Sequence, residues 1–262
     1  MPEHHHARLL AEERRRKILD AIEQNGQITI PELVKRFSVS AVTARGDLDA
    51  LTAGGAVIRS HGGAVRHEPT RDYPLRLKAT LHRAEKVRIG RAAADLVHPH
   101  ETIILDSGTT TAEIARQLKN SKPQSVTVIT NALNIAMELT DATGISVIMI
   151  GGLLRPVSYS FVGPQAEAML AELHADRLFL AVDGFDVEMG LSTPDILEAQ
   201  LNTCMIRAAR EVNVVADSSK LGRRSVSRIG QSEKIQRLIT DNRAPADVVD
   251  ALRKKHIEVT LV

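Results

Sequence analysis

The sequence has very few aromatic residues and no tryptophan. Aromatic side chains make up 2% of its 262 residues. Proteins that bind RNA or single-stranded nucleic acid commonly stack bases on aromatic side chains, so we expect neither of these binding modes. Aliphatic side chains must therefore fill the hydrophobic core, and a hydrophobic content of 43% is sufficient for that.

Cysteine and long apolar runs are scarce as well. The single cysteine, Cys204, cannot form a disulfide within the chain, which suits a reducing cytoplasm. No apolar run approaches the ~18 residues typical of a membrane span, and nothing resembles a signal peptide. The run His4-His5-His6 is too short to indicate a metal site. We therefore predict a cytoplasmic protein with no membrane partner, no metal and no cofactor.

The chain as a whole also lacks a strong charge of one sign. Its formal net charge is +2, and its length favours two domains. Residues 1–67 contain ten Lys and Arg against eight Asp and Glu, and the remainder contains 24 against 24. The whole excess therefore lies in the first quarter of the chain. This is a weak indication of a polyanionic partner there, and motifs must decide the question.

Three helical patterns in the first quarter predict a small helical domain. They cover residues 12–25, a stretch beginning just after Thr29, and residues 41–53. Their boundaries are marked by a glycine C-cap, a capping box and a serine N-cap, formed by Gly26, by Thr29 with Glu32, and by Ser40. The third helix has an apolar face of Ala44, Leu48 and Leu51, with Thr43, Arg45 and Asp47 on its other faces. Two helices joined by so short a turn are typical of a helix-turn-helix.

Two short strand patterns follow the third helix, at residues 56–59 and 64–66, on either side of His61-Gly62-Gly63. A hairpin in this position predicts a winged helix-turn-helix over residues 1–66. The alternative is a small helical bundle with an unrelated hairpin. We predict that Thr43 and Arg45 contact the major groove, together with Ser40 and Val42. The predicted contacts to the DNA backbone or minor groove are Arg59, His61 and Arg66.

Residues 67–80 contain two prolines and mixed charge without periodicity, and we interpret them as a linker. From residue 81 to residue 262, helical patterns alternate with short apolar strands. This alternation predicts a doubly wound α/β sheet of six or seven strands. The predicted strands are residues 102–106, 126–130, 146–150, 178–182, 213–216, 237–240 and 258–261.

The first of these strands leads into a hydroxyl-rich turn and then a helix. Ile103-Ile104-Leu105 forms the strand, and residues 106–111 form the turn. Unpaired backbone N–H groups at a helix N-terminus, together with the helix dipole, favour a phosphate group. An ordinary N-capped helix is the alternative interpretation of this stretch alone.

Several other strands also end in small or polar residues. Ligands of such sheets bind beyond the carboxyl ends of the strands, near the point where the strand order reverses. Each end alone could be an ordinary turn, but together they predict one site with two cations to offset a phosphate. The residues are Asp106, Ser107, Gly108, Thr109, Thr110, Thr111, Thr130, Asn131, Gly151, Gly152, Arg155, Asp183 and Lys220.

Both parts of the chain resemble the DeoR family of bacterial sugar-catabolism repressors. In the first part the resemblance is carried by Phe37-Ser38-Val39-Ser40, Thr43, Arg45, Asp47-Leu48, Leu51, Gly55, Arg59 and His61-Gly62-Gly63-Ala64. In the second part it is carried by residues 106–111, Thr130-Asn131, Gly151-Gly152 and residues 217–220. The chain departs from the usual pattern at Ala44 and Gly46, where the family normally has isoleucine and arginine. The family's sensor domain is itself similar to ribose-5-phosphate isomerase.

This resemblance implies a repressor that binds double-stranded operator DNA and a phosphosugar effector, and that is not an enzyme. The phosphate would lie on the 107–111 turn, assisted by Lys220. Hydroxyls or an amino group of the sugar would contact Asp106, Asn131, Asp183 and Glu198. Residues 190–200 and 217–220 are most similar to the branch that controls N-acetylgalactosamine and galactosamine use. Because DNA sites of winged helix-turn-helix proteins are usually paired, we expect a homo-oligomer, a dimer or tetramer.

Two alternatives belong to other functional classes. The second domain could isomerise sugar phosphates, which requires a carboxylate base and an electrophile. Carboxylates are present at Asp183, Asp186 and Glu198. The isomerases that the sensor domain resembles also use a lysine just after the loop that follows the fourth strand. No lysine occurs between Lys122 and Lys220, which argues against this chemistry. The chain could also be a constitutive architectural DNA-binding protein with an inert α/β domain.

Overall fold

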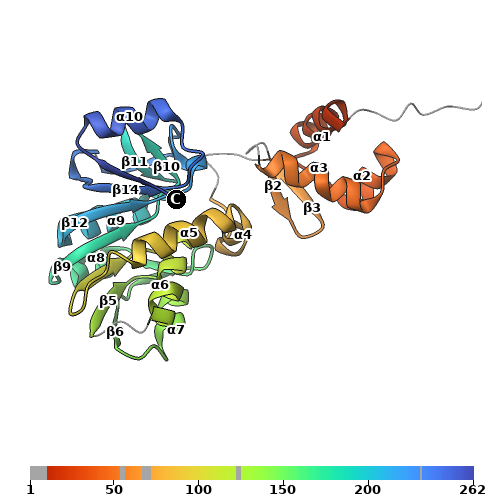
Figure 1. The fold of residues 1–262 in the computed structure, drawn as a ribbon. Helices are drawn as coiled ribbons and strands as arrows, with labels where there is room; N and C mark the ends of the chain where they lie inside the picture. Colours follow the sequence, from red (N-terminus) through yellow and green to blue (C-terminus); the bar gives the residue numbers. More distant parts are fainter. Residues whose placement is uncertain (1–10, 54–56, 67–71, 122–124, 231) are drawn as a thin grey trace, which may run out of the picture. The chain divides into compact units, whose positions relative to one another are not determined.

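A computed structural model describes residues 11–53, 57–66, 72–121, 125–230 and 232–262 of the chain. The chain divides into two compact units, Met1–Glu68 and Pro69–Val262, called here the first and the second unit. Figure 1 shows the first unit in red and orange, with its helices beside a small hairpin. The boundary lies close to the predicted end of the first domain at residue 66.

The first unit is a winged helix-turn-helix over its described residues. Its elements are α1 (Ala11–Asn25), β1 (Gln27–Thr29), α2 (Ile30–Phe37), α3 (Ala41–Ala53), β2 (Val57–Ser60) and β3 (Gly63–Arg66). The strands form an antiparallel sheet in the order β1-β3-β2. Its core contains Ile18, Ile22, Leu33, Ala44 and Leu48, all at most 1% exposed. The prediction of three helices and a wing is confirmed; residue 56 of the predicted hairpin lies outside the described residues.

The local signals in the sequence explain where these helices begin and end. Gly26 adopts a φ of 75°, and its amide donates to the Ile22 carbonyl at 2.8 Å. The Thr29 amide donates to the Glu32 carboxylate at 2.7 Å while the Glu32 amide reaches Thr29 Oγ1, which completes the capping box. The Thr43 amide donates to Ser40 Oγ at 3.1 Å, so Ser40 caps α3 as predicted.

The second unit is built on a seven-stranded parallel sheet. In spatial order the strands are β15 (Glu258–Leu261), β14 (Arg237–Thr240), β12 (Ala209–Val215), β9 (Ala175–Leu180), β4 (Thr102–Leu105), β5 (Val126–Thr130) and β6 (Ile145–Met149). The chain builds outward from β4 to β6 and then returns to add β9 beside β4. The strand order therefore reverses between β4 and β9, which is the topological switch point.

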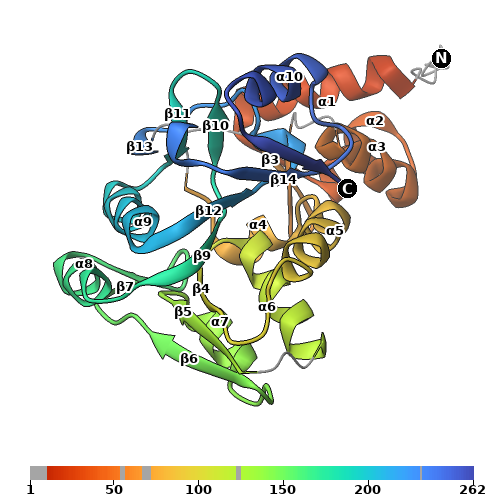
Figure 2. The same cartoon turned by 60° about the vertical axis from the view of Figure 1, so that its left-hand side comes forward.

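Helices cover both faces of this sheet (Figure 2). One face is covered by α5 (Arg83–Ala94), α6 (Thr109–Ser121) and α7 (Leu133–Leu139), and the other by α8 (Pro164–Ala171), α9 (Ile196–Ala208) and α10 (Ala246–Lys254). Each face has its own apolar cluster, filled mostly by aliphatic side chains, as the composition requires. The predicted doubly wound α/β architecture is confirmed. In the described ranges no helix is both long and apolar enough to cross a membrane.

Several short elements were not predicted. A hairpin of β7 (Leu153–Arg155) and β8 (Ser160–Val162) follows β6. A small antiparallel sheet of β10 (Gly184–Asp186), β11 (Gly190–Thr193) and β13 (Ser227–Gly230) follows β9. Two 3₁₀ turns, Ser218–Lys220 and Ser232–Lys234, complete the described elements.

The predicted linker differs most from the structure. Residues 67–71 lie outside the described residues, but residues 72–80 belong to the second unit and include α4 (Leu75–Thr80). Tyr73 and Leu75 are buried, and the Leu75 amide donates to the Val157 carbonyl at 2.7 Å. Contacts with distant residues hold this segment in place. It therefore needs no amphipathic face, and its sequence shows no helical periodicity.

Candidate functional site

The five strand ends that the sequence singled out lie side by side. They belong to β12, β9, β4, β5 and β6, which are consecutive neighbours in the sheet. All these strands are parallel, so their carboxyl ends meet at one edge. The turn after β4 and the segment after β9 flank the topological switch point, where ligands of such sheets bind.

The turn after β4 packs tightly because it contains Gly108. A Cβ atom at this position would lie 2.2 Å from the Cβ of Ala181, which follows β9. The Gly108 amide donates to Asp106 Oδ1 at 3.2 Å. Thr111 Oγ1 donates to the carbonyls of Asp106 and Gly108, so this hydroxyl stabilises the turn itself. Ser107 and Thr110 are buried beside it, and Thr109 begins α6.

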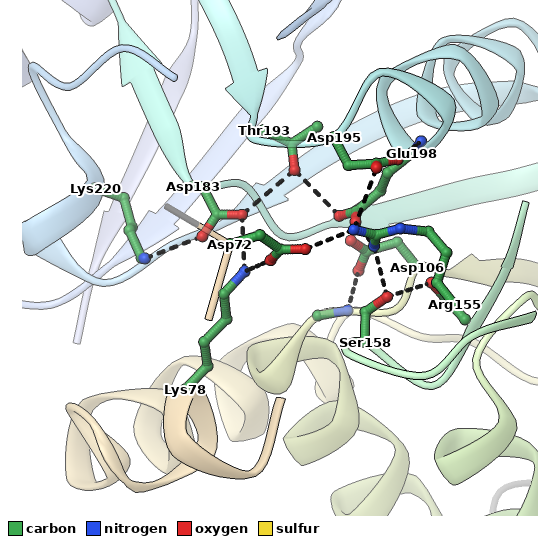
Figure 3. A network of polar contacts seen from close by, with 12 residues as sticks. Asp72, Lys78, Asp106, Arg155, Ser158, Asp183, Thr193, Asp195, Glu198 and Lys220 are labelled. Atoms are coloured by element: carbon green, nitrogen blue, oxygen red, sulfur yellow. Dashed lines mark hydrogen bonds and ion pairs between the residues drawn. The ribbon is translucent and has the colours of Figure 1, made fainter. Parts of the chain in front are cut away.

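Asp183 is the centre of a polar network at this edge (Figure 3). Its Oδ2 accepts from Lys78 Nζ at 3.1 Å and from Thr193 Oγ1 at 3.3 Å, and its Oδ1 accepts from Lys220 Nζ at 3.4 Å. Thr193 Oγ1 also lies 3.2 Å from Glu198 Oε1 on α9. Residues from α4, β11, α9 and the turn after β12 therefore converge on the segment that follows β9.

Arg155 is the second centre of the network and comes from the end of β7. Its Nη1 donates to Ser158 Oγ at 2.7 Å and to Glu198 Oε2 at 2.8 Å. Its Nη2 donates to Asp72 Oδ2 at 2.5 Å and lies 3.3 Å from Asp195 Oδ2. Figure 3 shows the guanidinium group enclosed by these oxygen atoms. Arg155 and Glu198 are mostly buried, with side chains 12% and 14% exposed.

Burial sets the protonation of two carboxyl groups of the site. It raises the pKa of Asp106 to about 7, against the opposing hydrogen bonds from Thr111 and the turn. Burial also raises the pKa of Glu198 to about 7, although the charge of Lys78 acts in the opposite direction. Both groups can therefore exchange protons near neutral pH.

The charges around Asp183 have the opposite effect. Burial alone would raise the pKa of Asp183, but Lys78 and Lys220 hold it well below its usual range. Burial alone would lower the pKa of Lys78, but Asp183, Glu198 and Asp72 raise it. This pair therefore stays charged. The pKa of Lys86 falls to about 8 because of its burial, and its ammonium donates to the Lys78 and Leu81 carbonyls.

The residues after β5 and β6 support the site rather than line the network. Asn131 Nδ2 donates to the Phe161 carbonyl at 2.9 Å, which fixes β8 and hence the hairpin that carries Arg155. Asn131 Oδ1 is buried and has no partner among the described residues. Thr130 Oγ1 accepts from the Ala132 amide. Gly152 has a φ of 142°, and Gly151 precedes it at the end of β6.

The structure brings five of the predicted site residues together at this edge of the sheet: Asp106, Arg155, Asp183, Glu198 and Lys220. Sequence reasoning missed several residues of the network: Asp72, Lys78, Ser158, Thr193 and Asp195. Asp195 had a local signal, since it caps α9 by accepting from the Glu198 amide at 2.9 Å. Asp72 and Lys78 had none, because they lie in the stretch interpreted as a linker. Among the described residues no cluster of three or more His, Cys, Asp or Glu is arranged to hold a metal ion.

The predicted DNA-binding face of α3 is solvent-exposed. Val42 is 76% exposed, and Arg45 and Gly46 are also exposed. Thr43 is half-buried, and its hydroxyl lies 2.9 Å from Ser40 Oγ. Ser40 and Thr43 therefore fix the start of the helix, while the side chain of the exposed Arg45 has no hydrogen bond or ion pair to another of the described residues.

The wing residues differ in what holds them. Arg59 donates to the Gly63 carbonyl at 3.1 Å and lies 3.2 Å from Asp49 on α3, so it joins the wing to the recognition helix. His61 is exposed at the tip of the hairpin. The backbone of Arg66 ends β3, but its side chain lies outside the described residues.

The sequence pattern placed Asp47 away from the apolar face of the third helix, but it is 2% exposed. Its carboxylate accepts from Arg14 at 2.5 Å and 3.1 Å and from Arg15 at 3.1 Å, both on α1. The helical periodicity placed it away from the apolar residues, yet α1 covers that face with two arginines. Asp47 therefore orients α3 rather than contacting DNA.

Comparison with known families gives two matches that together cover most of the chain. Residues 14–70 match the DeoR-like helix-turn-helix domain, and residues 81–242 match the DeoR C terminal sensor domain. The first match covers the winged helix-turn-helix, and the second covers most of the parallel sheet.

Comparison with individual proteins gives relatives over nearly the whole length. The chain is 41% identical to a protein named as an aga operon transcriptional repressor of Escherichia coli O157:H7, covering 95% of this chain and 93% of that protein. It is 29% identical to the glycerol-3-phosphate regulon repressor of Escherichia coli K12, covering 95% and 98%. Among solved structures, ribose 5-phosphate isomerase A from Methanocaldococcus jannaschii matches with 21% identity and a TM-score of 0.38, covering 52% of this chain and 53% of that one.

Proposed function

The chain belongs to the DeoR family of transcriptional regulators, and on this premise we propose that it represses a sugar-catabolic operon under the control of a phosphosugar. In this proposal the first unit binds double-stranded operator DNA. The second unit binds the phosphosugar and assembles the chain into a homo-oligomer. An amino-sugar operon is the specific candidate, because of the resemblance of residues 190–200 and 217–220 to that branch of the family.

The observation that carries the proposal is the meeting of the Gly108 turn with the Asp183 network at the switch point of the sheet. The turn supplies the first amides of α6, which have no partner within the helix and favour an anion. Lys220 and Arg155 supply positive charge in the network, where they pair with Asp183 and Glu198. Because Thr111 Oγ1 already bonds within the turn, the remaining side-chain donors for a phosphate are the hydroxyls of Ser107, Thr109 and Thr110.

The acidic half of the network suits the sugar end of such a ligand. Asp106, Asp183 and Glu198 can accept hydrogen bonds from hydroxyls, and Asn131 Oδ1 is buried without a partner among the described residues. The same carboxyl groups can accept from a protonated amino group, so a ligand with an amino group as well as a phosphate also suits them. The glycerol-3-phosphate regulon repressor is a relative whose name includes a phosphorylated compound.

A thermal-shift panel tests ligand binding. Hexose, pentose and amino-sugar phosphates are compared with the same sugars without phosphate. One phosphosugar should raise the melting temperature, because a ligand that binds only the folded state stabilises it. Its unphosphorylated form should raise it much less. A flat response to the whole panel would contradict sensing and favour the architectural alternative.

Operator binding is tested separately with the exposed Arg45. Arg45→Ala should abolish specific retardation of operator DNA while the melting temperature stays unchanged, because the side chain is exposed and lies outside the core. Arg36→Ala is the matched control, since Arg36 is a basic residue on α2 that we do not assign to DNA contact. Unchanged retardation by Arg45→Ala would overturn the assignment of Arg45.

Isomerisation of sugar phosphates is the second candidate, and one contact favours it. The sequence argued against it because no lysine lies between Lys122 and Lys220, but Lys78 comes within 3.1 Å of Asp183 from a different element. A cation therefore does accompany the carboxylate. Incubation of the purified protein with paired aldose and ketose phosphates tests this candidate, and detectable interconversion would establish it. Because the relatives described above are named as repressors, we expect none.

A further inference from the structure

The segment that precedes α5 contributes a carboxylate to the site. Asp72 follows the end of the first unit, Glu68, after only a few residues of sequence. Its two oxygens bridge two cations of the network: Oδ2 accepts from Arg155 Nη2 at 2.5 Å, and Oδ1 accepts from Lys78 Nζ at 3.3 Å. Asp72, which lies near the boundary of the two units in the sequence, is thus paired with Arg155, a cation that we assign to effector binding.

The rest of this segment is fixed independently of Asp72. Leu75 is buried and bonds to the Val157 carbonyl, and Lys78 remains held by Asp183. At the other end of α4, Lys86 Nζ donates to the carbonyls of Lys78 at 2.6 Å and Leu81 at 2.7 Å. Loss of the Asp72–Arg155 contact would therefore leave α4 in place and detach only the Asp72 side chain from Arg155.

Arg155 requires a counter-ion. Its side chain is 12% exposed, and a sheltered guanidinium that loses its carboxylates is strongly destabilising. Glu198 and Ser158 share Nη1, so Asp72 and Asp195 are left to satisfy Nη2. A phosphate that reaches Nη2 can take over the role of Asp72, because a guanidinium N–H donates a charge-assisted hydrogen bond to a phosphate oxygen as it does to a carboxylate oxygen.

We propose that Asp72 competes within the chain against the phosphate of the effector for Arg155, so that ligand binding detaches Asp72, which follows shortly after the first unit in the sequence, from the site. This inference rests on the proposed function and specifies how the site is regulated. In the ligand-free state Asp72 occupies Arg155 and lowers the apparent ligand affinity. In the ligand-bound state phosphate occupies Arg155, and Asp72 loses this contact. The ligand then distinguishes two arrangements of the chain, which coupling between sites requires.

Asp72→Asn tests the inference because it removes the competing charge and keeps the size of the side chain. We expect the variant to bind inorganic phosphate about tenfold more tightly than the wild type in titration calorimetry, since the competing state is no longer populated. Without any ligand, its affinity for the operator duplex should shift in the direction that saturating phosphosugar shifts the wild type. Unchanged phosphate affinity, or unchanged ligand-free operator affinity, would overturn the inference.

Asp195→Asn is the matched control. It also removes a carboxylate from Arg155 Nη2, but Asp195 lies at the start of α9, far along the chain from the boundary of the two units. Asparagine is an equally good N-cap, so the helix is retained. This variant should bind phosphate more tightly, yet phosphosugar should change its operator affinity by the same factor as in the wild type. If Asp195→Asn shifts the ligand-free operator affinity as Asp72→Asn does, Asp72 has no special role and the inference fails.

The proposed sensing function and the competition by Asp72 are contradicted by different results. A wild-type protein that no phosphosugar stabilises contradicts the proposed sensing function. The inorganic phosphate titration on Asp72→Asn still decides the inference in that case, since tighter binding shows that Asp72 competes for Arg155 and unchanged binding refutes it. A melting curve of each variant, with the α/β transition retained, excludes unfolding as the cause.

Discussion

At the scale of single residues, we single out Gly46, where the pattern that the sequence resembles normally has arginine. It lies in the interior of α3, it is exposed, and a Cβ atom there would meet nothing within 4 Å. Glycine in a helix interior costs about 1 kcal/mol relative to alanine because the unfolded chain loses more freedom on folding. The chain therefore carries a weakened recognition helix at a position that could take a side chain without strain.

Substitution of Gly46 separates helix stability from DNA contact. Gly46→Ala and Gly46→Arg should both stabilise the first unit by up to ~1 kcal/mol in urea unfolding. Only Gly46→Arg should also tighten operator binding and steepen the dependence of log K on log salt by about 1, the value for one added phosphate contact. Gly46→Ala serves as the control for helix stability alone. Equal salt slopes for the two variants would show that residue 46 does not face the phosphates.

The raised pKa of Asp106 leads us to expect that the stability of the second unit depends on pH. Burial raises its pKa from 3.8 to about 7 in the folded state, so between these values the folded chain holds a proton that the unfolded chain has lost. Stability from this group is full below pH 4 and falls as pH rises toward 7, by ~1.4 kcal/mol for each pH unit over which only the folded state is protonated. Glu198 acts in the same direction, and the depressed pKa of Asp183 acts only at lower pH.

Asp106→Asn should therefore reduce the loss of stability between pH 5 and pH 8, because the amide stays neutral and still accepts from the Gly108 amide. The measurement is urea unfolding of the second unit at both pH values. Glu188→Gln is the control, since Glu188 is a carboxyl on the surface with a side chain 75% exposed. An identical pH dependence in wild type and Asp106→Asn would contradict the raised pKa.

At the scale of elements, the turn between β4 and α6 depends on one close approach. Gly108→Ala would place a Cβ 2.2 Å from the Cβ of Ala181, so we expect a loss of about 1–3 kcal/mol from overpacking. Ala181→Gly removes the opposing atom, and the double variant should recover most of that loss. The free energies of unfolding of the two single variants and the double variant form a cycle. A strictly additive cycle would mean that the two residues do not meet.

The same turn illustrates what the sequence could predict. The strand, the turn and the helix over residues 102–121 are encoded by neighbouring residues, so periodicity and cap residues were sufficient. The capping box at Thr29 and Glu32 was predictable for the same reason. The order of parallel strands then brings distant turns to one edge, and that rule made Asp183 and Lys220 predictable as members of the site.

Elements held by distant contacts escaped prediction. The hairpin β7–β8 and the segment 72–80 are short, contain prolines and have no amphipathic period. Their stability comes from pairs such as Arg155 with Asp72, 83 residues apart, and Lys78 with Asp183, 105 residues apart. Asp47 shows the same limit within the first unit, because its burial depends on arginines 32 and 33 positions earlier.

At the scale of the whole molecule, the proposed regulator must obey thermodynamic reciprocity. If the phosphosugar changes the operator affinity by some factor, the operator must change the phosphosugar affinity by the same factor. The effector's Kd is measured by titration calorimetry with and without saturating operator duplex, and the operator's Kd by fluorescence anisotropy with and without saturating effector. We expect equal ratios of about 5–150, the usual range for coupled sites.

Arg45→Ala is the control, because a first unit that cannot bind the operator leaves the effector affinity insensitive to DNA. If both affinity ratios equal one, binding at the effector site and binding at the DNA-binding face are not coupled. If the ratio of effector affinities persists in Arg45→Ala, DNA acts on the second unit directly.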